Sequence, residues 1–273
     1  MLAILDFRNS EEHKLKFYSF SSSSRGNCYY LSGQSDAVLL DSGISARKIE
    51  TALAQIDTNT PLRGILLTHE HIDHIKSINT LVKHLQIPVF ATKGTWAALE
   101  KENCTVPQKL RVDLSGQSSL HLGDLTIRWH NTSHDSLEPV FYTIEENTEK
   151  FGLITDSGEL NSEILSMLYN SDILVAEANH DIKMLEQGPY PLNVKKRILS
   201  RYGHLSNEAC ACGLLKMIGP ATKHVMLAHL SQHNNTPKTA YNTVRKILAD
   251  ECPHDHYKLW VARAEDCSSL LET

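Results

Sequence analysis

The chain has 273 residues, of which 41% are hydrophobic and 22% charged, and its formal net charge is −5 at pH 7. This length and apolar content are enough for one large domain or two modest ones with a full hydrophobic core. The negative charge excludes an overall basic nucleic-acid binder, although a local basic groove is compatible with it. No apolar run approaches the roughly 20 residues that a membrane-spanning helix requires.

The N-terminal segment and the cysteines both favour a cytoplasmic protein. The first 16 residues contain no apolar stretch of signal-peptide length, so we expect the protein not to be secreted. The six cysteines are scattered and form no Cys-x-x-Cys pair, which is typical of reduced thiols. No linker or low-complexity segment divides the chain. We therefore predict a loosely held extension over residues 1–15 and a single domain over residues 16–273.

The first half of the chain begins with strand-like runs and continues with alternating strands and helices. Strands are expected at 17–20, 28–31, 37–40 and 88–90, with a Ser-rich loop at 21–27. The third of these strands ends in Asp41-Ser42-Gly43. Apolar residues recur with a helical period between Ile75 and Leu85, which predicts a helix before the last of these strands.

The second half repeats this order. Hairpin-like strands are expected at 120–127, 140–145 and 151–155. They are followed by predicted helices at 162–169, 193–201 and 206–218, by strands at 173–176 and 224–228, and by a helix capped by Thr236 with Pro237 at its first position. A loop through Pro189 and Pro191 is expected between them. The same alternation in both halves predicts an α+β fold, a four-layer αββα sandwich with two sheets face to face.

The most specific segment, residues 65–76, reads Ile-Leu-Leu-Thr-His-Glu-His-Ile-Asp-His-Ile-Lys. His69 and His71 are two positions apart just after a predicted strand, so both imidazoles can face one ion. Asp73 and His74 fall at the start of the next helix, where they can face a second ion a few ångströms away. Imidazole and carboxylate ligands suit zinc, manganese or iron.

Three later residues supply the partners that such a cluster needs, because His134, Asp156 and His229 each follow an apolar strand. In layered α/β folds the strand ends converge on one edge, where distant segments can assemble a site. Each ion would keep an open position for a shared water, as a catalytic site requires. The predicted ligands are His69, His71 and His134 for one ion, Asp73, His74 and His229 for the other, and Asp156 as a bridge.

The motifs around these residues resemble the metallo-β-lactamase superfamily from Lys16 onward. The turn Asp41-Ser42-Gly43 is similar to the Asp-x-Gly turn that supports the His loop in that family, where its Asp would hold either the loop or a ligand imidazole. Within it, the chain resembles the YycJ (WalJ) branch, whose members are regarded as cytoplasmic metal-dependent exonucleases or phosphodiesterases. It rests on residues 23–27, 68–74, 133–135, 154–158, 177–181, 203–207 and 228–232.

The resemblance also implies catalytic roles for residues outside the ligand set. In the phosphodiesterase branches of the superfamily, a Glu and a His in places similar to Glu177 and His204 form a pair beside the metals. His204 would then bind the phosphate or protonate the leaving oxygen, and Glu177 would orient its imidazole. Asp73 would contribute to catalysis as a metal ligand.

Two segments are candidates for contact with a nucleic-acid strand. Lys195, Lys196, Arg197 and Arg201 lead directly to His204 and can track a phosphate backbone, although the alternative is a solvated helix face. The Ser-rich loop that ends in Asn27 offers hydrogen-bond donors to a phosphate, and we expect Asn27 to contact the substrate.

These observations predict a cytoplasmic dinuclear metallohydrolase that cleaves phosphodiesters, an exonuclease acting on DNA rather than RNA, with a role in DNA repair. One alternative of the same chemistry is a hydrolase of small cyclic phosphodiesters or glutathione thioesters. The others are an iron-dependent redox protein of the same fold and a non-catalytic metal-binding scaffold. No membrane partner is expected.

Overall fold

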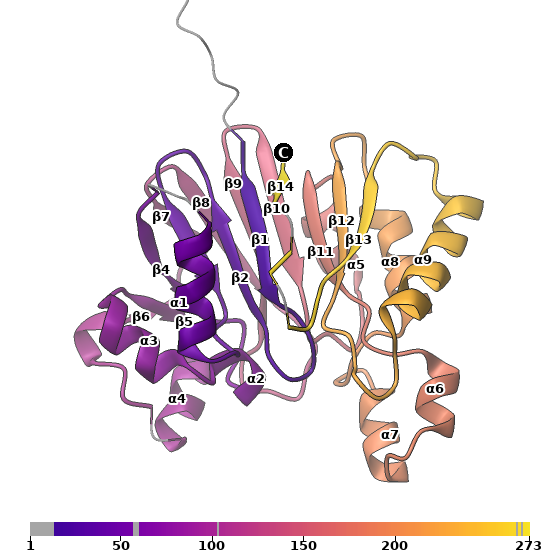
Figure 1. Cartoon of the computed structure of the whole chain (residues 1–273), viewed down its shortest axis with the longest axis horizontal. Helices are drawn as coiled ribbons and strands as arrows, with labels where there is room; N and C mark the ends of the chain where they lie inside the picture. Colours follow the sequence, from indigo (N-terminus) through magenta and orange to yellow (C-terminus); the bar gives the residue numbers. More distant parts are fainter. Residues whose placement is uncertain (1–13, 57–59, 103, 266, 269) are drawn as a thin grey trace, which may run out of the picture.

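The computed structural model describes residues 14–56, 60–102, 104–265, 267–268 and 270–273. Within these ranges the chain forms two mixed β-sheets of seven strands each, packed face to face, with helices on both outer sides (Figure 1). Of the N-terminal extension predicted over residues 1–15, residues 1–13 lie outside the described residues, and Leu15 is buried in the core between the sheets.

The first sheet has the strand order β14-β1-β2-β3-β4-β5-β6. Along this order, neighbouring strands are antiparallel from β14 through β1 and β2 to β3, and parallel from β3 through β4 and β5 to β6. Its strands are β1 Lys16–Ser21, β2 Cys28–Ser32, β3 Ala37–Leu40, β4 Leu62–Leu66, β5 Val89–Ala91, β6 Arg111–Asp113 and β14 Leu271–Glu272.

The second sheet has the order β13-β12-β11-β10-β9-β8-β7 and the same division into an antiparallel part, β7 to β10, and a parallel part, β10 to β13. Its strands are β7 Leu120–Leu122, β8 Leu125–Asn131, β9 Val140–Glu146, β10 Glu149–Ile154, β11 Ile173–Glu177, β12 His224–Ala228 and β13 Lys258–Val261. The alternation seen in both halves of the sequence thus becomes two sheets of matching topology.

Three hydrophobic clusters hold the four layers together. One fills the space between the sheets, one lies between the first sheet and helices α1 Ala46–Gln55, α3 Ile78–Leu85 and α4 Lys93–Lys101, and one lies between the second sheet and helices α5 Ser162–Leu168, α8 Asn207–Met217 and α9 Pro237–Glu251. In β2, for example, Tyr29 and Leu31 face the other sheet and Tyr30 faces the helices, as the two-residue period of a strand requires. The predicted αββα sandwich is confirmed.

Three short helices lie near the edge where the parallel strands end: α2 Ile72–Ile75, α6 Ile182–Gln187 and α7 Leu192–Ile198. A 3₁₀ turn at Gln108–Leu110 directly precedes β6. Figure 1 shows α2, α6 and α7 at the lower end of the molecule. Helix α6 lies within the segment through Pro189 and Pro191 for which the sequence predicts a loop. It is a short helix capped by Asp181, whose side chain accepts from the backbone N–H of Met184. Among the described residues, no helix is long and apolar enough to cross a membrane.

Candidate metal centre

The predicted site residues come together where strands of both sheets end. Asp41 follows β3, Asp156 comes two residues after β10, Glu177 is the last residue of β11 and His229 follows β12. The segment from His69 onward connects the end of β4 to α2. Because the carboxyl ends of parallel strands meet at one edge of a sheet, segments far apart in the sequence meet there.

Three of these positions have an unusual backbone conformation. Asp41, Asp156 and His229 have positive φ angles of 61°, 55° and 54°. Non-glycine residues rarely adopt this left-handed region, where Asp, Asn and His are the most frequent exceptions. Each residue therefore turns the chain sharply at or just after the end of its strand. Such a turn is tolerated where the surrounding structure holds it, and it is frequent at functional sites.

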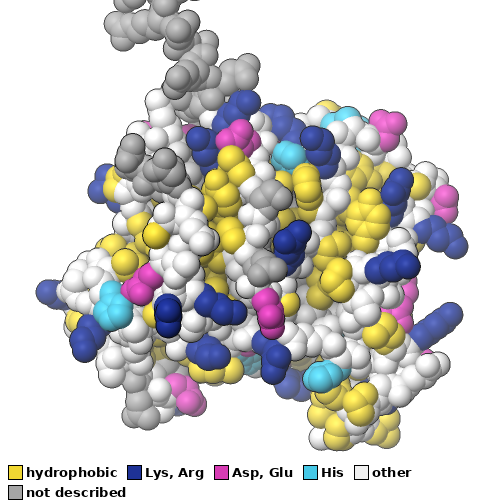
Figure 2. Space-filling model, in the orientation of Figure 1, with side chains coloured by type: hydrophobic (Ala, Val, Ile, Leu, Met, Phe, Trp, Pro, Cys, Tyr) yellow, Lys and Arg dark blue, Asp and Glu magenta, His cyan; other side chains and the backbone are white. Residues whose placement is uncertain are grey.

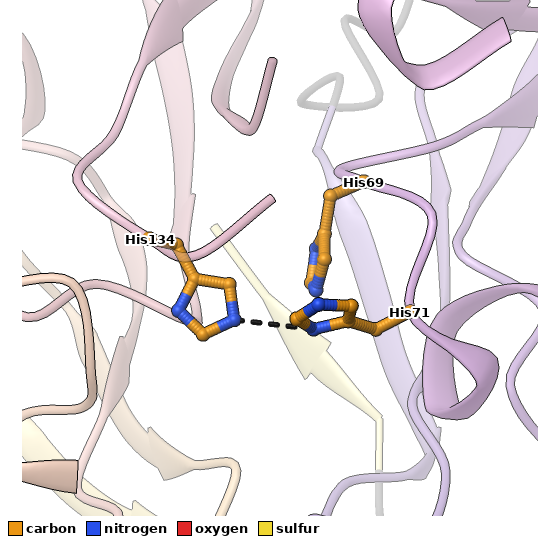
Figure 3. A group of neighbouring side chains, drawn as sticks. All are labelled: His69, His71 and His134. Atoms are coloured by element: carbon orange, nitrogen blue, oxygen red, sulfur yellow. Dashed lines mark hydrogen bonds between the residues drawn. The ribbon is translucent and has the colours of Figure 1, made fainter. Parts of the chain in front are cut away.

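The first group consists of His69, His71 and His134, whose ligand atoms all lie within 4.8 Å of one another. His134 Nε2 is 3.2 Å from His71 Nδ1, and Figure 3 shows the three imidazole rings facing a common space. His69 Nε2 is buried and has no hydrogen-bond partner among the described residues. Burial and the neighbouring His74 hold the pKa of His69 well below its ordinary value. A neutral imidazole with a free nitrogen is the form that binds a metal.

The second group consists of Asp73, His74 and His229, again with ligand atoms within 4.8 Å of one another. Asp73 Oδ2 is 3.3 Å from His229 Nε2 and 3.5 Å from His74 Nε2. Asp156 lies between the two groups, with Oδ2 3.0 Å from His74 Nε2 and Oδ1 3.7 Å from His134 Nε2. Its carboxylate therefore contacts a member of each group.

The Nδ1 atoms of three of these imidazoles are held by buried acceptors. His74 donates to Asp41 Oδ2 at 2.7 Å, and His229 donates to Glu177 Oε1 at 3.0 Å. His134 donates to the backbone oxygen of Gly203 at 3.1 Å. These bonds set the orientation of each ring and leave its Nε2 facing the site. Asp41 thus occupies the supporting position that the resemblance implied.

Thr68 is a supporting residue that the sequence analysis missed. Its buried hydroxyl lies 2.9 Å from Asp41 Oδ2 and 3.0 Å from His69 Nδ1. Its backbone N–H donates to Asp41 Oδ1 at 2.8 Å. Thr68 therefore links the Asp41 turn to the histidine loop. The signal in the sequence was a Thr between the end of an apolar strand and the first His.

Glu177 and His204 form the predicted pair beside these groups. His204 Nδ1 donates to Glu177 Oε1 at 2.8 Å, and Glu177 Oε2 accepts from the backbone N–H groups of Ser157 and Leu205. Burial alone would lower the pKa of His204, but the Glu177 carboxylate raises it above its ordinary value. The His204 side chain is 17% exposed and Glu177 is fully buried, so His204 is the member that a ligand can reach.

Asn27 lies beside the second group of predicted ligands. It is fully buried, and its amide nitrogen is 3.1 Å from His74 Nε2 and 3.4 Å from Asp73 Oδ2. The Asn27 side chain therefore contacts two of the predicted ligands of the second group. Its expected contact with the substrate stays a prediction.

The basic segment lies on and after α7, which has no buried residue. Arg197 forms an ion pair with Asp135, Lys195 donates to a backbone oxygen at 2.7 Å, and the Arg201 guanidinium lies over an aromatic ring, 4.7 Å from its centre. Lys196 is exposed. The segment is next to the site, but two of its four cations already have charged or aromatic partners.

Comparisons with known proteins agree with this geometry. Residues 36–230 match the family described as the Beta-lactamase superfamily domain. The chain is 36% identical over 238 residues to the exodeoxyribonuclease YycJ of Bacillus anthracis, covering 87% of this chain and 90% of that protein. It is 35% identical over 241 residues to the exodeoxyribonuclease WalJ of Streptococcus pneumoniae, covering 86% and 88%.

Among solved structures, the metallo-β-lactamase fold protein YhfI from Bacillus subtilis aligns with a TM-score of 0.70 and 15% identity, over 96% of this chain and 100% of that one. At this identity the likeness bears on the fold alone. The fold family and the His/Asp cluster together indicate that the site binds divalent metal. The chain belongs to the metallo-β-lactamase superfamily, in its YycJ-like branch.

Proposed function

We propose that this protein is a dinuclear metal-dependent phosphodiesterase that removes nucleotides from the end of a DNA strand. The observation that carries the proposal is the Asp156 carboxylate, which contacts histidines of both groups while the Glu177–His204 pair lies beside it. The two curated relatives named as exodeoxyribonucleases support a DNA substrate, since the chain covers nearly nine tenths of each.

The residues present fit a pair of divalent ions. One ion would be held by His69, His71 and His134, the other by Asp73, His74 and His229, and Asp156 would serve both. Zinc, manganese and iron all accept this set of imidazoles and carboxylates. Such ions supply Lewis-acid chemistry, activating water near neutral pH and neutralising charge on the phosphoryl group.

The chain itself would handle the leaving group. His204 Nδ1 is engaged by Glu177, so Nε2 is the atom left to face a substrate. From there it can donate a hydrogen bond to a phosphoryl oxygen or a proton to the leaving oxygen. Glu177 keeps the imidazole oriented and stabilises its protonated form, because its carboxylate is ionised. Although Glu177 is buried, hydrogen bonds from His204 and from two backbone N–H groups stabilise that charge.

We also assign the protein to the cytoplasm, with a role in DNA repair. All six cysteines are free thiols in the structure, which accords with a reducing compartment. A nuclease that works from strand ends acts on broken or gapped DNA, and this supports the repair assignment.

End-labelled single- and double-stranded DNA and RNA test the proposal. The strands are incubated with protein reconstituted separately with zinc, manganese or iron, and metal-stripped protein is the control. We expect DNA to shorten progressively from one end, faster than RNA, with at least one of the metals. If no nucleic acid is cut with any metal while a cyclic phosphodiester or a glutathione thioester is hydrolysed, the protein is a small-molecule hydrolase instead.

A further inference from the structure

A cavity of about 190 Å³ is lined in part by the Ser-rich turn at residues 21–27, and none of the predicted metal ligands lines it. Its walls include hydroxyl groups and long basic side chains from three separate segments: the β1–β2 turn, the start of α1 and the end of α2. The residues that matter for its chemistry are Ser21, Ser23, Arg25, Ser45, Lys48 and Lys76.

The charge of this cavity is unusual for an acidic protein. Arg25, Lys48 and Lys76 face it together with a single carboxylate, that of Glu265. None of the three cations forms an ion pair or side-chain hydrogen bond within the described ranges, whereas Arg197 pairs with an aspartate. Figure 2 shows Lys and Arg side chains gathered over the lower part of this face, across the region of α1 and α2. Cations brought together without a partner repel one another, so an anion between them would be stabilised.

The cavity is lined by sequence neighbours of residues that contact the second group of predicted ligands, and not by those ligands themselves. The backbone N–H of His229 donates to Ser22 Oγ at 2.8 Å, and the N–H of Asn27 donates to the backbone oxygen of Asp73 at 2.8 Å. Lys76 is three residues after Asp73, one helical turn further along α2. The segments that line the cavity, the Ser-rich turn and the end of α2, therefore also contribute residues to the metal centre or contact it.

The start of α1 adds to the positive character. Ser45 is its N-cap, and the first turn contains no acidic residue. The partial positive charge at a helix N-terminus then adds to the charges of Lys48 and Arg25. Hydroxyl groups nearby, such as those of Ser23 and Ser45, can donate to an anion's oxygen atoms.

We propose that this cavity binds a phosphate group of the substrate strand, next to the phosphodiester that is cleaved. The inference rests on the proposed function, because it takes the strand to be a nucleic acid. A phosphate matches three converging cations and hydroxyl donors, and an arginine can engage it through two parallel hydrogen bonds. The phosphate is either the terminal one of the strand or an internal one of its backbone, and the two differ in charge.

Binding of hydrolysis-resistant phosphorothioate oligonucleotides tests this inference by fluorescence anisotropy, with the metal-loaded full chain. The oligonucleotides carry a phosphate at the 5′ end, at the 3′ end or at neither. The test variant combines Arg25→Gln, Lys48→Gln and Lys76→Gln. The matched control removes the same charge from exposed positions on α3, α8 and α9, as Lys83→Gln, Lys216→Gln and Lys246→Gln.

We expect the test variant to bind about ten-fold more weakly than the control, which corresponds to about 1.4 kcal/mol. A loss confined to one phosphorylated end assigns the cavity to a terminal phosphate, and an equal loss for all oligonucleotides assigns it to an internal one. If the test and control variants bind every oligonucleotide alike, the inference is wrong. Cleavage of unmodified DNA by the wild-type protein is measured in parallel, so failure of the proposed function would be seen separately.

Discussion

At the scale of single residues, Asp156 is the residue whose carboxylate lies between the two groups. Its carboxylate is 3.0 Å from one histidine of the second group and 3.7 Å from one of the first, and its backbone φ is +55°. Burial would raise its pKa, but His229 and His74 hold that pKa well below the ordinary value, so the side chain is a carboxylate. A buried carboxylate surrounded by imidazoles is a natural bridge between two cations.

Replacing Asp156 and replacing His204 should therefore have different effects. Asp156→Ala should lose both activity and metal, because it removes the shared carboxylate. His204→Ala should keep its metal and still lose about 10²–10⁴-fold in phosphodiester cleavage, the usual contribution of a positioned acid–base group. Elemental analysis and cleavage of labelled DNA measure the two effects, and the exposed His256 provides a control substitution. A fully active His204→Ala protein would refute the role given to this residue.

Gly43 matters because the turn that contains it packs against the metal loop. A Cβ atom at this position would lie 1.5 Å from the backbone oxygen of Asp73, which is an impossible contact. Gly43→Ala should displace the Asp73 loop, destabilise the protein by about 1–3 kcal/mol and lower its metal content. Chemical denaturation and elemental analysis measure this.

Gly116 is the matched control, since a Cβ there meets nothing within 4 Å and only its φ of +77° strains the substitution. Gly116→Ala should lose some stability and keep its full metal content. If Gly43→Ala also kept all its metal, the turn would not position the loop as described.

At the scale of elements, the places of the candidate ligands could be predicted from the sequence, whereas many of the residues that support them could not. The candidate ligands follow apolar strands, and the period and length of those strands can be read directly from the sequence. The buried position of Asn27 depends instead on contacts between the β1–β2 turn and α2, which are 46 residues apart in sequence. The left-handed turns at Asp41 and His229 likewise come from tertiary packing rather than from local propensity.

Helix α7 and the residues after it carry a separate prediction about binding. Replacing Lys195, Lys196, Arg197 and Arg201 with Gln should weaken strand binding for all sequences and reduce its salt dependence, because counterion release scales with phosphate contacts. Anisotropy titrations at several salt concentrations measure this. A strand affinity and salt slope equal to those of the wild-type protein would mean that the segment is only a solvated helix face.

At the scale of the whole molecule, the site requires both sheets to be held at a constant separation. Tyr142 on β9 is fully buried, and its hydroxyl donates to the backbone oxygen of Leu67, just after β4, at 2.6 Å. This hydrogen bond connects the second sheet to the segment that leads into the histidine loop. Family membership confirms the prediction of a metal-dependent hydrolase with this sandwich.

Tyr142→Phe should therefore lower the free energy of unfolding by about 1–3 kcal/mol, because it leaves a buried carbonyl without its donor. Tyr169→Phe is the control, since that side chain is 48% exposed. Urea denaturation of both variants gives the comparison. Equal stability of the two would show that the hydrogen bond between the sheets contributes nothing.

The central claim is that the strand ends of the two sheets hold two divalent ions. Its most direct test is the metal content per chain, measured by elemental analysis after metal stripping, reconstitution and removal of free metal. We predict close to two ions per chain for the wild-type protein and a clear loss for Asp156→Ala. A content clearly below one ion per chain in the wild-type protein, or two ions retained by Asp156→Ala, would contradict the account.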